Sequence, residues 1–117
     1  MNIGNLGFKG EDLACNYLEK QGYEIIARNF FCNQGEIDII AKDKKEFVFI
    51  EVKTRSNFKY GNPIDAVNYY KKKHIWNASR YYIYKNNLES KFIRFDVIEV
   101  LVLEKTYKIN QIKNIMI

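Results

Sequence analysis

Three residues of types that serve metal-dependent phosphate chemistry fall in two neighbouring apolar segments. Asp38 lies in the run 36–41, and Glu51 and Lys53 lie in the run 47–54. Carboxylates are ligands that Mg²⁺ takes from proteins, together with waters and phosphate oxygens. A lysine beside them could hold a nucleophilic water or stabilise charge that develops on a phosphate. The three residues are therefore the candidate catalytic set, with Asp38 and Glu51 as candidate metal ligands.

The two segments are expected to pair as an antiparallel hairpin. With a turn at residues 44–45, Asp43 pairs with Glu46 and Asp38 falls directly opposite Glu51. Directly opposed side chains share a face with Cβ atoms about 4.5–5.5 Å apart, and like charges placed so are destabilising on their own. A cation between the carboxylates would remove that cost. An odd loop length would instead place an apolar residue opposite Asp38.

The strand that carries Glu51 is expected to have one polar face and one apolar face. Strand period two places Glu51 and Lys53 on one face. The other face then carries the apolar residues Val48, Ile50 and Val52. Ionised groups are rarely buried without a partner, so the polar side carries either chemistry or a surface. A solvated face of an edge strand is the alternative to a metal site.

The remaining pattern predicts the elements that would position these residues. Helical spacing, capping residues and β-branched or aromatic runs predict the order α-β-β-β-α-β, with a weak further strand. This order indicates one α/β domain with a mixed sheet flanked by helices. The expected elements are a helix from about Asn5 to Gln21, strands at 23–31, 36–41 and 47–54, a helix from Asn62 to about Lys85, a strand at 92–103 and a weak terminal strand within 106–117.

Composition narrows the classes of protein to consider. The chain has 117 residues, enough for one domain, and its 47% hydrophobic content excludes a disordered polar chain. No apolar stretch approaches the roughly 20 residues of a membrane span. The first residues lack the pattern of a secretory signal, so we expect a cytoplasmic protein. Cys15 and Cys32 are too few for a zinc cluster or a disulfide framework.

A basic cluster is the candidate contact for a polyanion. Lys71, Lys72 and Lys73 follow two tyrosines, and the net charge of +5 is compatible with a nucleic-acid partner. The alternative is a solvated helix face. Arg55, at the end of the strand that carries Lys53, could add a bidentate phosphate contact, although an ordinary strand-end arginine is the rival interpretation.

A set of motifs along nearly the whole chain resembles the YraN family of bacterial proteins. That family is similar to PD-(D/E)xK endonucleases, which include archaeal-type Holliday junction resolvases. The motifs are Gly10-Glu11-Asp12-Leu13-Ala14, Gly35-Glu36-Ile37-Asp38-Ile39-Ile40-Ala41, Phe49-Ile50-Glu51-Val52-Lys53-Thr54-Arg55, Tyr60-Gly61-Asn62-Pro63 and Arg94-Phe95-Asp96-Val97.

The resemblance implies a restriction-endonuclease-like fold and roles for four residues. Asp38 and Glu51 would bind the metal, Lys53 would be the catalytic lysine, and Glu11 would be a further acid that reaches the metal. The spacing of residues does not itself point to Glu11, because an exposed helical glutamate is usually solvated. Ile37 stands where the motif name has proline.

Two functions follow as the main hypotheses. The first is a Mg²⁺- or Mn²⁺-dependent endonuclease that hydrolyses phosphodiesters in DNA, with branched substrates among the candidates. The second is a non-catalytic nucleic-acid-binding module with a nuclease fold, active in repair, recombination or uptake. A third alternative is a metal-stabilised interaction protein without a nucleic-acid role. Because resolvase-like enzymes act as two-fold dimers, the resemblance also raises the expectation of a homodimer.

Overall fold

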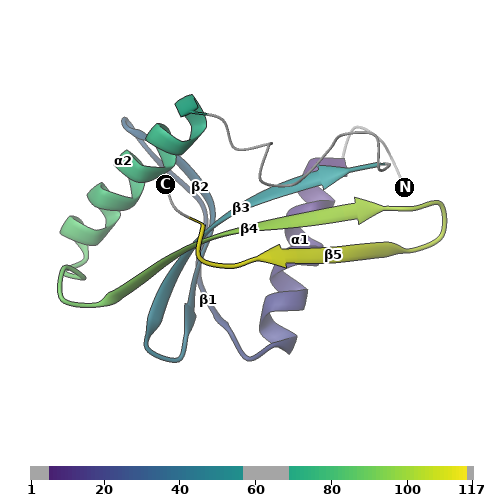
Figure 1. The fold of residues 1–117 in the computed structure, drawn as a ribbon, viewed down its shortest axis with the longest axis horizontal. Coiled ribbons are helices and arrows are strands. Elements are labelled where there is room, and N and C mark those ends of the chain that lie inside the picture. The colour runs from purple at the N-terminus through teal and green to yellow at the C-terminus, as the bar shows by residue number, and fades with distance from the viewer. Residues whose placement is uncertain (1–5, 57–68, 116–117) are drawn as a thin grey trace.

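Five strands form one mixed sheet in chain order, and two helices pack against it (Figure 1). The computed structural model describes residues 6–56 and 69–115. Adjacent strands are antiparallel except β3 and β4, which are parallel and are joined by the segment that contains α2. The elements are α1 (Leu6–Lys20), β1 (Glu24–Cys32), β2 (Gly35–Asp43), β3 (Glu46–Arg55), α2 (Tyr69–Lys85), β4 (Phe92–Val102) and β5 (Tyr107–Ile112).

The predicted order of elements is confirmed, including the terminal strand that the pattern marked as weak. The second helix ends at Lys85 as expected. Its expected start at Asn62 and the motif 60–63 lie outside the described residues. Neither described helix is both long and apolar enough to cross a membrane.

Both helices end in the same backbone motif. After α1, the amide of Gly22 donates to the Glu19 carbonyl at 3.0 Å and that of Tyr23 to the Leu18 carbonyl at 2.9 Å. Gly22 has φ 93, a left-handed conformation that glycine adopts without strain. The end of α2 repeats this pattern with Asn87, whose φ is 57. These local signals fix the residue at which each helix ends.

The helices cover opposite faces of the sheet, which divides the core in two. On the α1 face, Leu18 packs among the inward side chains of β2, β3 and β4. On the α2 face, Ala78 packs with Phe49 and its neighbours. Alternate residues of β3 separate as strand period two predicts, with Val48, Ile50 and Val52 on the α1 face. Glu51 is therefore directed toward the α2 side of the sheet.

Arg94 holds the start of β4 to the β2–β3 hairpin. Its guanidinium is buried, and it pairs with Asp96 at 3.0 Å, Glu46 at 3.1 Å and Asp43 at 3.2 Å. The Tyr23 hydroxyl lies 2.6 Å from the same group. Burial lowers the pKa of Arg94, but the hydrogen bonds and charge of Asp96 outweigh burial and raise it overall. Asp96 is therefore a structural partner of Arg94.

Candidate metal and nucleic-acid site

The hairpin that carries the candidate ligands has the predicted register. Asp43 pairs with Glu46, and the pairing continues to Ile39 and Ile50. Residues 44–45 form the turn, and Lys44 adopts a left-handed φ of 56, which the tight reversal requires. The loop has an even number of residues, which is the condition that a pairing of Asp38 with Glu51 required.

The sheet opens where Asp38 would have faced Glu51. The pair Ile39–Ile50 is the last between β2 and β3, and beyond it the Asp38 carboxylate accepts a hydrogen bond from the Val52 amide at 2.8 Å. Ile37 packs on the α2 face and Ile39 on the α1 face, so the alternation of β2 slips at Asp38. The expectation that Asp38 and Glu51 share a face as a regular cross-strand pair is therefore wrong. The Asp38 side chain lies between the strands instead.

The pairing between β1 and β2 is also interrupted at this level. Arg28 pairs with Ile39 and Phe30 with Ile37, but the described register skips Asn29 and Asp38 between them. Asn29 has φ 52, a conformation that asparagine tolerates better than most residues. A local opening on both sides of Asp38 makes room for its side chain in the plane of the sheet.

Glu51 and Lys53 share one side of β3, as strand period predicts. The Lys53 ammonium lies 3.6 Å from the Glu51 carboxylate. The Glu51 side chain is only 7% exposed, whereas that of Lys53 is 22% exposed. A buried carboxylate needs such a partner. Because Asp38 binds the amide of the residue between them, the three predicted catalytic residues meet on one segment of β3.

A close approach of α1 to β3 brings Glu11 toward this group. Gly10 is buried, and a Cβ added there would overlap the Thr54 hydroxyl. Only glycine therefore permits this helix-to-strand distance. The helix consequently presents Glu11 close enough to Asp38 for the two negative charges to interact.

The Glu11 carboxyl has a pKa above its ordinary value of 4.5. Burial is the largest cause, and the negative charge of Asp38 adds to it. A hydrogen bond with Asn29 and the charge of Arg28 act in the opposite direction. Burial and the neighbouring Asp38 charge therefore both disfavour the ionised form of Glu11.

Arg28 and Asn29 are two neighbours of the site that the sequence alone did not indicate. The Arg28 guanidinium lies 2.7 Å from the Asp12 carboxylate and 3.9 Å from that of Glu11, which places Arg28 beside the candidate acid Glu11. The available signal was the polar pair Arg28-Asn29 in the middle of an otherwise apolar strand. It could have indicated a break in the pairing of that strand.

The predicted nucleic-acid contacts are distributed more widely. Arg55 pairs with Glu99 at 3.1 Å, and both side chains are largely buried. Lys73 is exposed near the start of α2. Lys71 and Lys72 belong to the same helix, but their side chains lie outside the described part of the chain. Of these four residues, only Arg55 is placed on the strand that carries Lys53.

The donor set suits a hard cation that keeps part of its own solvent shell. Across residues 6–56 and 69–115, no three histidine, cysteine or acidic side chains gather closely enough to hold a metal alone. Asp38 and Glu51 remain two carboxylates at neighbouring positions, because Asp38 accepts from the amide of Val52, the residue after Glu51. Mg²⁺ commonly uses one or two carboxylates and completes its shell with waters and phosphate oxygens.

Comparison with known proteins places the chain in a family. Residues 10–100 match the family described as "Uncharacterised protein family UPF0102". The chain belongs to the UPF0102 family. This range contains Glu11, Asp38, Glu51 and Lys53, so the whole candidate site lies within the part that defines a UPF0102 protein.

Several UPF0102 relatives match over almost their full length. A UPF0102 protein of Clostridioides difficile strain 630 is 50% identical over 97% of this chain and 98% of its own. One from Clostridium botulinum strain 657 is 49% identical over 94% and 92% of the two chains. A UPF0102 protein of Caldicellulosiruptor bescii is 46% identical over 97% and 98%. UPF0102 is the YraN family, so the resemblance seen in the motifs is confirmed.

Proposed function

We propose that this protein is a Mg²⁺- or Mn²⁺-dependent endonuclease of the PD-(D/E)xK type that hydrolyses phosphodiester bonds in DNA. The observation that carries the proposal is the hydrogen bond from the Val52 amide to the Asp38 carboxylate at 2.8 Å. It fixes one acid against the short segment that carries Glu51 and Lys53. Two carboxylates and an ammonium group at one place suit metal-assisted attack on a phosphate.

The order and pairing of the elements support the nuclease-type fold. A helix, an antiparallel three-stranded unit and a crossover helix are followed by a strand parallel to β3. This agrees with the α-β-β-β-α-β core that the family resemblance implies. The candidate residues lie on β2 and β3 and on α1, which packs over β3.

Asp38 and Glu51 would hold the metal, and Glu11 would contribute from the outside. Burial raises the pKa of Glu11, and the negative charge of Asp38 adds to this shift, which supports a position of Glu11 near Asp38. A bound divalent cation supplies Lewis acidity toward the phosphate and lowers the pKa of a bound water. Asp38 would help to position that cation, because the Val52 amide restrains its carboxylate.

Lys53 would act at the reacting phosphate. Its ammonium is held 3.6 Å from Glu51 and remains partly exposed, so it can turn toward a substrate. A positive charge there would stabilise the negative charge that develops on the phosphate oxygens. Loss of such a group commonly costs about 10²–10³ in rate. Lys53 can also donate a hydrogen bond to a water that attacks the phosphorus.

The substrate would be gripped through its phosphates beside the site. Lys73 is exposed on α2, and Arg55 is anchored by Glu99 at 3.1 Å on the strand that carries Lys53. We assign Lys71, Lys72, Lys73 and Arg55 to this contact with the phosphate backbone of DNA. Because phosphate contacts release counterions, binding should weaken steeply with salt.

A cleavage panel tests the proposal. Purified protein with Mn²⁺ or Mg²⁺ is incubated with linear, nicked and four-way-junction DNA, beside Lys53→Ala, Asp38→Asn and the control Lys113→Ala. Lys113 is exposed after β5, so its variant carries the same loss of charge as Lys53→Ala. We expect cleavage by wild type and control only. Equal cleavage by every variant would refute the site, and binding without cleavage in any metal would favour the non-catalytic module.

A further inference from the structure

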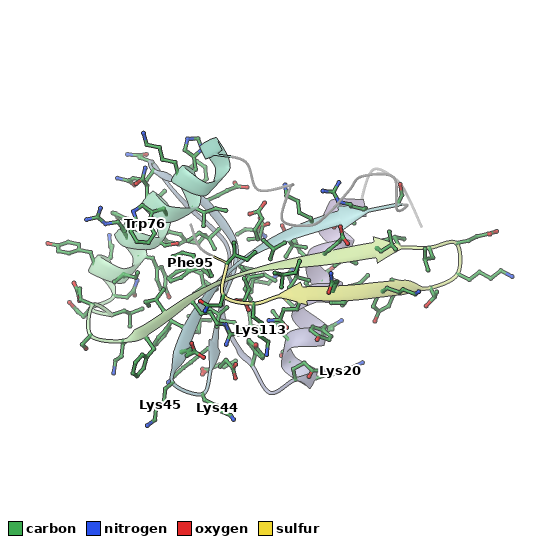
Figure 2. The ribbon with its side chains drawn as sticks, viewed as in Figure 1. Lys20, Lys44, Lys45, Trp76, Phe95 and Lys113 are labelled. Carbon is green, nitrogen blue, oxygen red and sulfur yellow. The ribbon has the colours of Figure 1, made fainter. Side chains whose placement is uncertain are left out.

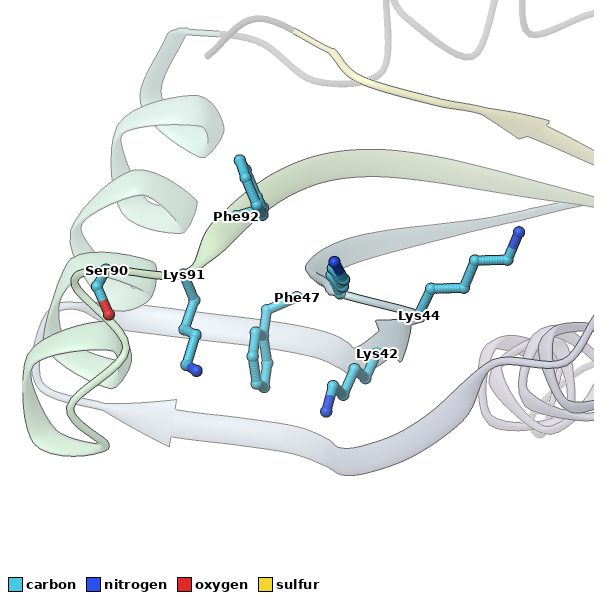
Figure 3. Close-up of a pocket in the computed structure, with 7 residues that line it drawn as sticks. Lys42, Lys44, Phe47, Ser90, Lys91 and Phe92 are labelled. Carbon is cyan, nitrogen blue, oxygen red and sulfur yellow. The ribbon is translucent and has the colours of Figure 1, made fainter.

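A basic pocket lies at the tip of the β2–β3 hairpin, apart from the candidate catalytic residues. Its volume is about 390 Å³. Figure 2 shows Lys44 and Lys45 projecting from this tip, away from Trp76 and Phe95 on the α2 side. The pocket is shown in Figure 3 and is lined by Lys42, Lys44, Lys45, Phe47, Ser90, Lys91 and Phe92. We call these residues the hairpin-tip pocket.

The charge of the hairpin-tip pocket is positive and lacks compensation within its lining. Four of its seven lining residues are lysines, and none is acidic. The two acids that flank the turn, Asp43 and Glu46, instead lie 3.2 and 3.1 Å from the buried Arg94. They pair with each other, one position along from the Lys42–Phe47 pair, and so point to the opposite face. Asp43 and Glu46 therefore point away from the lysines, and Glu24 is the cross-strand partner of Lys42 on β1.

One aromatic ring lies among these ammonium groups. The Lys42 ammonium lies 5.6 Å from the centroid of the Phe47 ring. Figure 3 shows the Phe47 ring between the side chains of Lys42 and Lys91, with all three pointing the same way. Phe92 pairs with Glu46, and its ring points the other way. A phenyl ring bounded by cations can stack on a nucleic-acid base while the cations contact phosphates.

The pocket is built from segments with defined conformations. Lys44 sits in the tight turn with φ 56. Lys91 follows the end of α2, where Leu88 is buried and the Leu88 amide donates to the Ile83 carbonyl at 2.9 Å. The Lys91 amide donates to the Leu88 carbonyl at 3.0 Å. These contacts place Lys91 opposite the hairpin.

We propose that the hairpin-tip pocket binds an unpaired nucleic-acid strand, with phosphates on its lysines and a base against the Phe47 ring. A base inside a duplex already has its faces stacked, so a strand without a partner fits this ring best. Lys45 lies about 20 Å from Glu51 along β3, at about 3.3 Å per residue. The pocket would hold a strand that extends from the candidate site, and this choice of partner rests on the proposed function.

Binding of a fluorescent oligothymidylate in EDTA over a range of salt concentrations tests the lysines. The variant Lys45→Ala/Lys91→Ala is compared with Lys105→Ala/Lys108→Ala, which removes two exposed lysines near the β4–β5 turn. Each phosphate contact contributes about 0.7 to the slope of log affinity against log salt for single strands. We expect the hairpin-tip variant to lose about 1.4 from the slope. The control should keep the wild-type slope.

The phenyl ring is tested by a pair of single substitutions. Phe47→Ala should weaken oligothymidylate binding by roughly tenfold, since stacking on one base commonly contributes that much. Phe31→Ala removes a ring that is 75% exposed at the other hairpin and should leave affinity unchanged. Because Phe47 is only half-buried and the two tested lysines are exposed, the variants should keep the wild-type circular dichroism spectrum.

Three outcomes would overturn the proposal. These are equal salt slopes for the two lysine pairs, equal losses of affinity for Phe47→Ala and Phe31→Ala, or the same loss of affinity for a blunt duplex as for oligothymidylate in the hairpin-tip variants. The measurement in EDTA is independent of cleavage. If cleavage is absent while the hairpin-tip slope falls, the proposed catalysis fails and the pocket stands. If cleavage depends on Lys53 while the slope is unchanged, the pocket fails and the nuclease stands.

Discussion

The carboxylate of Asp38 accepts a hydrogen bond from the main-chain amide of Val52 at 2.8 Å, at the point where β2 and β3 cease to pair. A side chain here replaces the carbonyl that a regular strand would offer. One acid is thereby fixed next to Glu51 and Lys53 without a further loop. The candidate site is a local opening of the sheet rather than a pocket on one of its faces.

Replacing Asp38 should separate its structural role from its charge. Asp38→Ala leaves the amide of buried Val52 without an acceptor, which should cost about 1–3 kcal/mol in the free energy of unfolding. Asp38→Asn retains an oxygen acceptor and removes one negative charge near Glu11, so it should be at least as stable as wild type. Urea unfolding measures both variants. Equal stability of the two would show that the Val52 contact contributes nothing.

Glu11→Gln should stabilise the protein in a pH-dependent way. The raised pKa of Glu11 means that the folded state holds its proton more tightly than the unfolded state. Stability of the wild type therefore falls as pH rises above the ordinary pKa of 4.5 and levels off beyond the folded pKa. The Glu11→Gln variant does not lose stability in this way, because its side chain cannot ionise. Its advantage in melting temperature should be small at acidic pH and larger at neutral pH.

The opposite dependence, or none, would contradict this assignment of Glu11. Adding Mg²⁺ at neutral pH provides a second check, because a cation near Glu11 should reduce the advantage of the variant. A ligand that binds only the folded state stabilises it by about 2.7 kcal/mol at one hundred times its Kd. We expect the melting temperature of wild type to rise more with Mg²⁺ than that of Glu11→Gln.

Gly10→Ala should destabilise the protein although alanine favours helices. In an open helix, the exchange gains about 1 kcal/mol from propensity. Here the new Cβ overlaps the Thr54 hydroxyl, and such overpacking typically costs about 1–3 kcal/mol. Adding Thr54→Ala should recover part of that loss. Thermal unfolding of the single and double variants checks this, and a more stable Gly10→Ala would show that α1 has room to move from β3.

Arg94→Met should be the most destabilising single substitution among these predictions. It removes one partner of a buried ion cluster and leaves Asp96 uncompensated at 2% exposure. Breaking such a pair commonly costs about 3–5 kcal/mol. Arg80→Met, at an exposed position of α2, should change stability by no more than about 0.5 kcal/mol. Similar losses in the two variants by chemical unfolding would contradict the structural role of Arg94.

Local rules predicted most of the fold. The end of α1 at Gly22, the register from Asp43 and Glu46 and the two faces of β3 follow from turn chemistry and strand period. The pairing of Arg94 with Asp96 follows because residues two apart on a strand share a face. Each of these features depends on residues close in sequence.

Contacts between distant segments could not be predicted in the same way. Strand period places Asp38 on a face of the sheet, but a hydrogen bond to Val52 draws it between the strands. The proximity of Glu11 depends on contact between Gly10 and Thr54, which are far apart in the chain. Only the family resemblance pointed to Glu11. Tyr23 likewise reaches Arg94 across most of the sequence.

The rate of DNA cleavage under single-turnover conditions tests the nuclease assignment most directly. Wild type, Lys53→Ala and Lys113→Ala are compared with excess protein over DNA, in Mn²⁺ and in EDTA. We expect cleavage by wild type in Mn²⁺ only, a loss of about 10²–10³ in Lys53→Ala and no change in Lys113→Ala. Cleavage that persists in EDTA, or that proceeds equally in all three proteins, would contradict a metal-dependent site built on Asp38, Glu51 and Lys53.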